Sequence, residues 1–273
     1  LLSTTQDLRT TIDEQLFWVA NSRPLDVNWL RQLPQHLQQE WREGEWRAVL
    51  PTRWKGLSWD MLVGAPLLLL SVVLIALRGH IKARLALIHS QIGRLKSDTQ
   101  LHTPKAVLLN ALLAVPGPLA LAGTGVALRT AEGGLALGLA PALLQLGLSW
   151  FVVALGRRLL VPDGVAERHF TWSPAYNARL RRLLIGLGMA LVPVVAIAAM
   201  SEHMETPLAQ RPVAMALFMG GLLAMAWSLT QLILAHVPSF GVRLFRLILG
   251  LAMAAVPLVL MGLVAWGYEY TAL

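Results

Sequence analysis

Residues 183–200 have the sequence LLIGLGMALVPVVAIAAM, which contains no charged side chain. Arg181 and Arg182 precede this stretch, and Glu202 follows soon after it. At about 1.5 Å of rise per residue, a helix of this length covers about 27 Å, close to the thickness of a bilayer's hydrocarbon core. The stretch therefore predicts a transmembrane helix with a basic end at one membrane surface.

Five further apolar runs have similar lengths. Together the predicted spans are 57–77, 106–128, 133–155, 183–200, 213–235 and 247–266. The composition agrees, because 56% of the 273 residues are hydrophobic and only 14% are charged, whereas soluble domains carry about a quarter of charged residues. We expect an all-α fold, a polytopic membrane helical bundle of about six transmembrane helices over residues 57–273, preceded by a juxtamembrane segment over residues 1–56.

Lysine and arginine are distributed unevenly between the connections. Segments 78–105 and 156–182 hold six each and segment 236–246 holds two, whereas the alternating connections hold only Arg129 and Arg211. Positive residues near span ends are retained in the cytoplasm, so the three basic segments are the predicted cytoplasmic loops and residues 1–56 are expected outside. The arginines expected at the inner leaflet, either for contact with anionic lipid or for topology alone, are Arg157, Arg158, Arg181 and Arg182.

An internal repeat links two of the spans. The twelve residues from Arg182 to Pro193 align without gaps on those from Arg246 to Pro257, with eight identities, and Lys105 precedes Pro116 at the same distance. We expect repeated helical hairpins, with similarity of apolar composition as the alternative, chiefly for the span that contains Pro116. Proline removes one backbone hydrogen bond and bends a helix. The predicted helix kinks are Pro66, Pro116, Pro141, Pro193 and Pro257.

Tryptophans mark the approach to the first span. Trp46, Trp54 and Trp59 are expected to be interfacial aromatics, because an indole ring is favourable at the level of the lipid head groups. An aromatic cage for a ligand is the less favoured alternative.

Two amphipathic stretches flank the first span. The stretch before the span has an apolar stripe and is expected to lie on the membrane or on other outer-side protein. The stretch after the span also has an apolar stripe; it either extends the span or lies on the inner leaflet, or forms a short helical hairpin with its neighbour. The stripe residues are Leu30, Leu33, Leu37 and Trp41 before the span, and Ile81, Leu85, Ile88, Ile92 and Leu95 after it.

The residues that catalysis or metal binding would require are not evident. The predicted spans hold no ionisable residue apart from Asp60, there is no cysteine, and the seven histidines show no ligand spacing. We therefore predict no catalytic residue, no cofactor and no metal site, and no nucleic-acid partner, because the basic residues lie in short loops. A secondary transporter, a lipid-handling protein and a passive anchor of a periplasmic domain remain rival classes.

Three segments outside the spans resemble those of the large MscS-family mechanosensitive channels. They are LFWVANSRPLD at 16–26, RLKSDTQLHTPK at 94–105 and GVAERHF at 164–170. The resemblance implies a bacterial inner-membrane protein that assembles as a homoheptamer and opens under membrane tension in osmotic downshock. It also implies that this chain is the peripheral, lipid-facing and tension-sensing part, in contact with membrane lipids, whereas the pore helix and cytoplasmic vestibule lie outside it.

Overall fold

The computed structural model describes residues 25–43, 53–54, 59–91, 101–129, 131–132, 134–201, 211–235 and 240–268. Nearly all of these residues are helical, which confirms the all-α prediction. The helices are α2 (Val27–Glu43), α3 (Trp59–Ala76), α4 (Arg78–Gln91), α5 (His102–Ala114), α6 (Pro116–Leu128), α7 (Gly134–Leu159), α8 (Val165–Arg168), α9 (Pro174–Ser201), α10 (Pro212–Leu234) and α11 (Phe240–Ala265). A short antiparallel pair joins β1 (Arg53–Trp54) to β2 (Ala131–Glu132).

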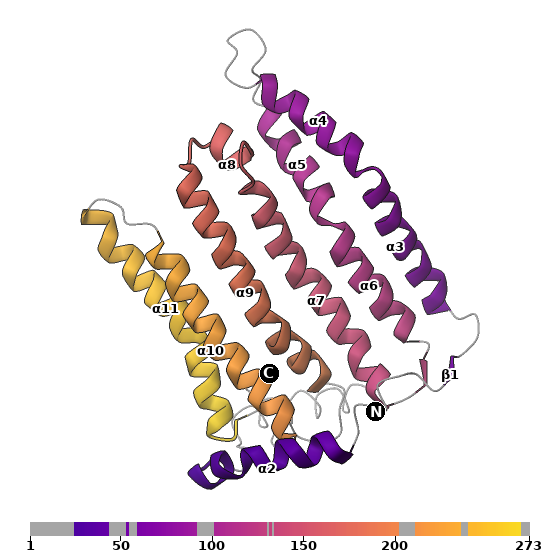
Figure 1. Ribbon diagram of the computed structural model, residues 1–273, viewed down its shortest axis with the longest axis vertical. Helices are drawn as coiled ribbons and strands as arrows, with labels where there is room; N and C mark the ends of the chain where they lie inside the picture. Colours follow the sequence, from indigo (N-terminus) through magenta and orange to yellow (C-terminus); the bar gives the residue numbers. More distant parts are fainter. Residues whose placement is uncertain are drawn as a thin grey trace, which may run out of the picture.

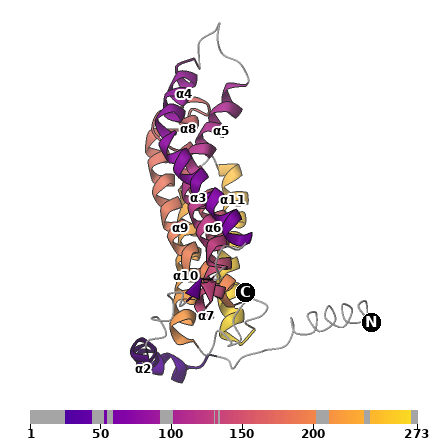
Figure 2. The ribbon, with the colours of Figure 1, turned by 90° about the vertical axis from the view of Figure 1, so that its right-hand side faces the viewer.

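The long helices stand side by side in one row (Figure 1). Along the row the order is α3, α6, α7, α9, α10 and α11, and each packs chiefly against the next. Figure 2 shows the row edge-on, where it is narrow in comparison with its width in Figure 1. The molecule is therefore a wall of antiparallel helices, not a bundle closed around a central core.

Four helices in the described part of the chain are long and apolar enough to span a membrane, namely α7, α9, α10 and α11. Two more spans result if each of two bent pairs counts as one: α3 with α4, bent by 54°, and α5 with α6, bent by 45°. The total of four to six agrees with about six transmembrane helices. The predicted division at residues 56 and 57 lies outside the described residues and stays a prediction.

The amphipathic stretch after the first span forms a hairpin with its neighbour. α4 leaves the end of α3 at an angle and packs against α5, as Figure 1 shows. Its stripe residues Ile81, Leu85 and Ile88 are partly buried, whereas Leu87 is exposed. The contact with α5 is the one that the helical hairpin predicts, while extension of the span and a position on the inner leaflet stay predictions.

Glycines allow neighbouring helices of the row to approach closely. A Cβ atom added at Gly123 of α6 would lie 3.1 Å from the carbonyl oxygen of Gly64 in α3. A Cβ atom added at Gly221 of α10 would lie 2.9 Å from Cγ of Pro193 in α9. Such close packing stabilises helix pairs in lipid, where the hydrophobic effect does not drive helices together.

Helix α2 crosses the foot of the row (Figure 1). Asp26 caps it, because the carboxylate accepts a hydrogen bond from the backbone N–H of Trp29 at 2.8 Å. The backbone N–H of Leu25 donates to the carbonyl of Ala265 at 2.8 Å, and Leu25 and Trp29 pack on a cluster formed by α9, α10 and α11. The start of α2 is thereby fixed to the last three helices.

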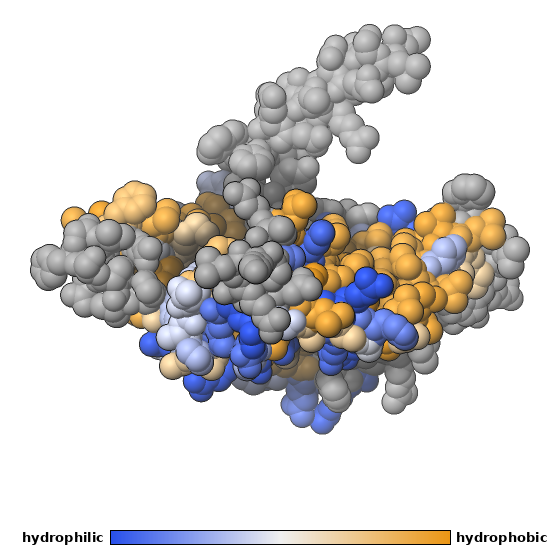
Figure 3. Space-filling view, turned by 90° about the horizontal axis from the view of Figure 1, so that it is seen from above, coloured by the Kyte–Doolittle hydropathy of each residue, from blue (hydrophilic) through white to orange (hydrophobic). Residues whose placement is uncertain are grey.

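The opposite end of the row carries the arginine-rich connections. α4, the start of α5, α8 and the facing ends of α10 and α11 lie there (Figure 1), and we call it the basic end. Figure 3 looks onto this end and shows hydrophilic side chains among apolar ones. The described parts of the predicted cytoplasmic loops thus lie at one end of the molecule.

Candidate functional site

The candidate site lies at the basic end, around the turn that carries the GVAERHF motif. α7 ends at Leu159, α8 covers four residues of the motif, and α9 begins at Pro174. Asp163 has φ of 56°, a left-handed conformation that aspartate adopts more readily than most residues. A Cβ atom at Gly164 would lie 2.6 Å from the carbonyl oxygen of Val161, so the tight turn requires glycine there.

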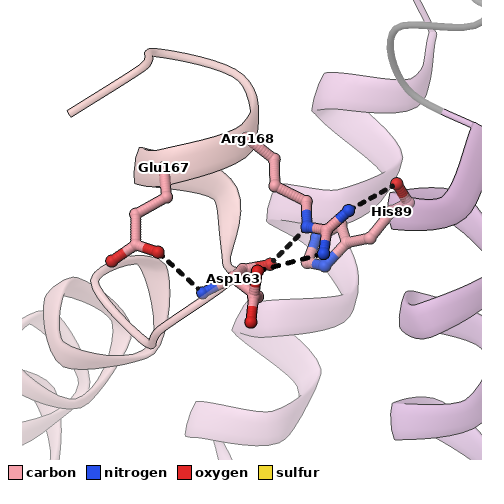
Figure 4. A network of polar contacts seen from close by, with 4 residues as sticks. All are labelled: His89, Asp163, Glu167 and Arg168. Atoms are coloured by element: carbon pink, nitrogen blue, oxygen red, sulfur yellow. Dashed lines mark hydrogen bonds and ion pairs between the residues drawn. The ribbon is translucent and has the colours of Figure 1, made fainter. Parts of the chain in front are cut away.

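Charged side chains of the motif hold this turn together and attach it to α4 (Figure 4). Arg168 forms an ion pair with Asp163 at 3.0 Å, and its Nη1 donates to the carbonyl of His89 at 3.4 Å. Glu167 accepts from the backbone N–H of Asp163 at 2.9 Å and from the side chain of Asn177 in α9 at 3.2 Å. The ion pair is exposed and therefore contributes little to the free energy of unfolding. Its role is to fix the position of the turn.

Two histidines meet behind this network. Nδ1 of His169 lies 2.7 Å from the hydroxyl of Thr103 in α5, and the rings of His169 and His89 are 5.9 Å apart. Burial lowers the pKa of His89, and the positive character of His169 and Arg168 lowers it further, while Asp163 raises it. The motif therefore connects the α4–α5 hairpin to the α7–α9 turn.

The predicted inner-leaflet arginines occupy the same end. Arg157 and Arg158 lie in the last turn of α7, and Arg181 and Arg182 lie near the start of α9. Nε of Arg157 is buried and has no hydrogen-bond partner. The charges of Arg157 and of Arg78, at the start of α4, both act on Arg158. Within the described part of the chain, no carboxylate forms an ion pair with Arg78, Arg157 or Arg158.

An apolar groove of about 680 Å³ lies beneath α8. α7 contributes Gly156 and Leu159 to its wall, Leu160 follows directly after α7, and α9 contributes Leu180 and Leu184. Three aromatic residues that the sequence-based predictions did not include also line it. They are Phe170, Trp172 and Tyr176. Trp172 contacts both others, with ring centroids 6.5 Å and 5.5 Å away, so the spacing of aromatic residues from 170 to 176 was a usable signal.

The predicted kink prolines are spread along the row. Pro116 begins α6 at the bend after α5, and its carbonyl accepts a hydrogen bond from the hydroxyl of Ser71 at 2.7 Å. The other four lie within helices that continue through them, and bending at these positions stays a prediction. They are Pro66 in α3, Pro141 in α7, Pro193 in α9 and Pro257 in α11.

Two of the predicted interfacial tryptophans, Trp54 and Trp59, lie toward the α2 end of the row. Trp59 is the first residue of α3, and Trp54 pairs with Ala131 in the short β1–β2 ladder. Trp46 lies outside the described residues. A position at the lipid head groups stays a prediction for all three.

Comparison with known proteins defines the class to which this row of helices belongs. Residues 61–273 match the family described as "Mechanosensitive ion channel inner membrane domain 1", and the chain belongs to that family. It is a multi-pass membrane domain of the MscS type.

Two curated relatives are similar to this chain. The mechanosensitive channel MscK of Escherichia coli (strain K12) is 28% identical over all 273 residues of the chain, which cover 24% of that protein. An uncharacterized MscS family protein of Haemophilus influenzae (strain ATCC 51907 / DSM 11121 / KW20 / Rd) is 27% identical over 112 residues, which cover 41% of the chain and 10% of that protein. The chain therefore spans about a quarter of the first relative's length.

Proposed function

We propose that this chain is the peripheral, lipid-facing and tension-sensing region of a mechanosensitive ion channel of the MscS family. The observation that carries the proposal is the single row of helices. Only 17% to 28% of the residues in the most apolar part of each of the four long spans are buried within the molecule. Most of the span surface is therefore available to lipid.

The exposed surface is apolar on helices throughout the row. Leu148 and Val152 of α7 are 74% and 69% exposed, and Trp227 of α10 is 68% exposed. Such an extent of exposed apolar surface is typical of contact with a membrane or with other protein. Tension favours the conformation that occupies more membrane area, and it shifts the equilibrium in proportion to the difference in membrane area between the two states. A wide wall of tilting hairpins offers a large area over which that difference acts.

The proposal includes orientation and assembly. The basic end lies in the cytoplasm and residues 1–56 lie in the periplasm, because arginines and lysines concentrate at one end of the row. The protein resides in the bacterial inner membrane and forms a homo-oligomer, a heptamer by family resemblance. The channel opens under the membrane tension that osmotic downshock produces. The family match does not favour the rival classes of transporter, lipid-handling protein or passive anchor.

The test is a recording of tension-gated current from the full-length protein in membrane patches that lack other mechanosensitive channels. Val152→Asn places an amide on a strongly exposed position of α7 and weakens the contact with acyl chains. We expect a higher tension at half-maximal opening for Val152→Asn and an unchanged one for Val152→Ile. No tension-gated current from the wild-type protein, or equal midpoints for both variants, would contradict the proposal.

A further inference from the structure

The pair of helices α4 and α5, which we call the arm, is joined to the rest of the row through two bends. α4 is bent by 54° from α3, and α5 is bent by 45° from α6. The two helices of the arm pack against each other, and the contact of α5 with α7 is less extensive than that of α6 with α7. α4 is exposed along much of its length. The arm is therefore attached to the row less firmly than α6 is.

The two bends contain residues that weaken a helix, and they are linked to each other. Pro116 and Pro118 have no backbone N–H, so two hydrogen bonds of the helical ladder are absent where α5 meets α6. Gly117 between them has nothing within 4 Å of an added Cβ, and the same is true of Gly79, just after the other bend. The hydroxyl of Ser71 in α3 donates to the carbonyl of Pro116 at 2.7 Å. The two bends together form one hinge.

The far end of the arm is held by the GVAERHF motif. Arg168 donates from Nη1 to the carbonyl of His89 in α4 at 3.4 Å, as Figure 4 shows, and Nδ1 of His169 lies 2.7 Å from the hydroxyl of Thr103 in α5. We call these two contacts the latch. His89 and Thr103 each lie about twelve residues from their bend, which is about 18 Å along the helix. A small rotation at the hinge therefore separates the latch residues.

The strength of the latch suits a contact that opens and closes. A single hydrogen bond of this kind shifts an equilibrium by only about 2- to 10-fold. Arg168 and His169 also bring positive character to His89, which opposes the contact when the histidines are protonated. Rotation of the arm away from α7 increases the membrane area that the row covers, and tension favours the state of larger area.

We propose that the latch is an autoinhibitory contact. It holds the arm against the α7–α9 turn in the closed channel and opens when the arm swings outward about the hinge under tension. The inference rests on the proposed function, because it requires a channel that tension opens. It extends that function by assigning the GVAERHF motif a role in setting the tension at which the channel opens.

The first test is a pair of threonine variants in patch recordings of the full-length protein. Thr103→Val removes the hydroxyl that meets His169 and keeps the branched side chain. We expect half-maximal opening at a lower tension, with the ratio of open to closed channels at a fixed tension raised roughly 2- to 10-fold for each latch. The matched control is Thr124→Val in α6, whose hydroxyl donates to the carbonyl of Ala120 in its own helix at 2.8 Å. That variant should open at the wild-type tension.

Equal midpoints for the two threonine variants, or a higher midpoint for Thr103→Val, would overturn the latch. The failure of the proposed function gives a different result. In that case the wild-type protein itself shows no tension-gated current.

The second test is a disulfide across the latch, which is measured without a recording of current. The chain contains no cysteine, so Thr103→Cys with His169→Cys adds one pair to a full-length protein cleared of any other cysteines. We expect an oxidant to join the pair in resting membranes, seen in the mass of the linked peptides, and to join it more slowly in vesicles swollen by hypo-osmotic dilution. The single-cysteine variants are the controls. No disulfide at rest, or an equal rate in swollen vesicles, would contradict the proposal.

The same disulfide separates a latch from a contact that merely stabilises the fold. Oxidation should raise the tension at half-maximal opening, and a reductant should restore it, whereas Thr103→Val should act in the opposite direction. A general loss of stability does not produce two opposite and reversible shifts. An oxidised channel that opens at the tension of the reduced one would overturn the proposal.

Discussion

At the scale of single residues, the GVAERHF motif connects four helices. Gly164 permits the turn, Glu167 reaches α9 through Asn177, and Arg168 reaches α4 through the carbonyl of His89. The histidine that follows adds α5 through Thr103. Glu167, Arg168 and His169 therefore each fix the position of a neighbouring helix.

Gly164→Ala should destabilise the protein. The added Cβ would lie 2.6 Å from the backbone oxygen of Val161, which cannot move without opening the turn. We expect a loss of about 1–3 kcal/mol, typical of overpacking, seen as a lower unfolding temperature in detergent. The matched control is Gly79→Ala in α4, where nothing lies within 4 Å of the added atom. That variant should be neutral or slightly more stable, because alanine favours a helix. A similar loss in both variants would contradict the explanation.

His89 should make stability depend on pH. Its pKa is lowered in the folded protein from the ordinary 6.5, first by burial and then by His169 and Arg168. The unfolded chain then binds more protons than the folded one as the pH falls below 6.5, so stability is complete above that pH and declines below it. We expect the unfolding temperature to drop by a few degrees between about pH 7 and pH 5.

His89→Gln should reduce this slope, while His80→Gln, on an exposed part of the same helix, should retain it. A wild-type slope that persists without His89 would assign the effect to other groups.

At the scale of elements, the sequence predicted the spans better than it predicted the bends. Long uncharged runs such as 183–200 are sufficient to predict a transmembrane helix, because hydrocarbon thickness sets their length. The bend between α3 and α4 occurs at Leu77, where no proline marks it. It accompanies the packing of α4 against α5, the next helix along the chain, and such a tertiary contact leaves no mark on the residues at the bend. The groove escaped prediction for the same reason, because five elements contribute to it.

The contact between α9 and α10 gives a further prediction at this scale. A Cβ atom at Gly221 would lie 2.7 Å from Val194 and 2.9 Å from Pro193, and 3.2 Å from the carbonyl oxygen of Ala190. Gly221→Val should force the two helices apart and lower the unfolding temperature, at a cost of about 1–3 kcal/mol. The adjacent Gly220 has nothing within 4 Å of an added Cβ, so Gly220→Val bears the same change in helix propensity without the clash. Equal unfolding temperatures for the two variants would show that α9 and α10 separate without cost.

At the scale of the whole molecule, the arrangement in one row could not be predicted from the spans. Spans that are apolar on every side give no periodic stripe from which to infer the number of neighbours. A closed bundle and an open wall therefore give similar sequences in lipid. In this row, glycines permit close approach at Gly123 between α3 and α6 and at Gly221 between α9 and α10. The two helices of the internal repeat, α9 and α11, lie on either side of α10, and α11 forms the edge of the row.

The two repeated prolines give the last prediction, which concerns the response of the whole row to tension. Pro193 lies at the close contact with Gly221 of α10, and Pro257 is fully buried on α11, which also packs against α10. Each lacks the N–H that would bond to the residue four positions earlier, which leaves both helices easier to bend at similar depth. Replacing both by alanine restores those bonds and stiffens the two neighbours of α10. If opening requires these helices to bend, Pro193→Ala with Pro257→Ala should raise the tension at half-maximal opening in patches of the full-length protein.

The expected change in the gating equilibrium is about 0.5–2 kcal/mol, so at a fixed tension the ratio of open to closed channels should fall by roughly 2- to 30-fold. Pro66→Ala is the control, because Pro66 lies on an exposed part of α3, at the opposite edge of the row from α11. A double variant with the wild-type midpoint would exclude bending at these prolines from the gating transition. The row would then respond to tension by the tilting of straight helices about their glycine contacts.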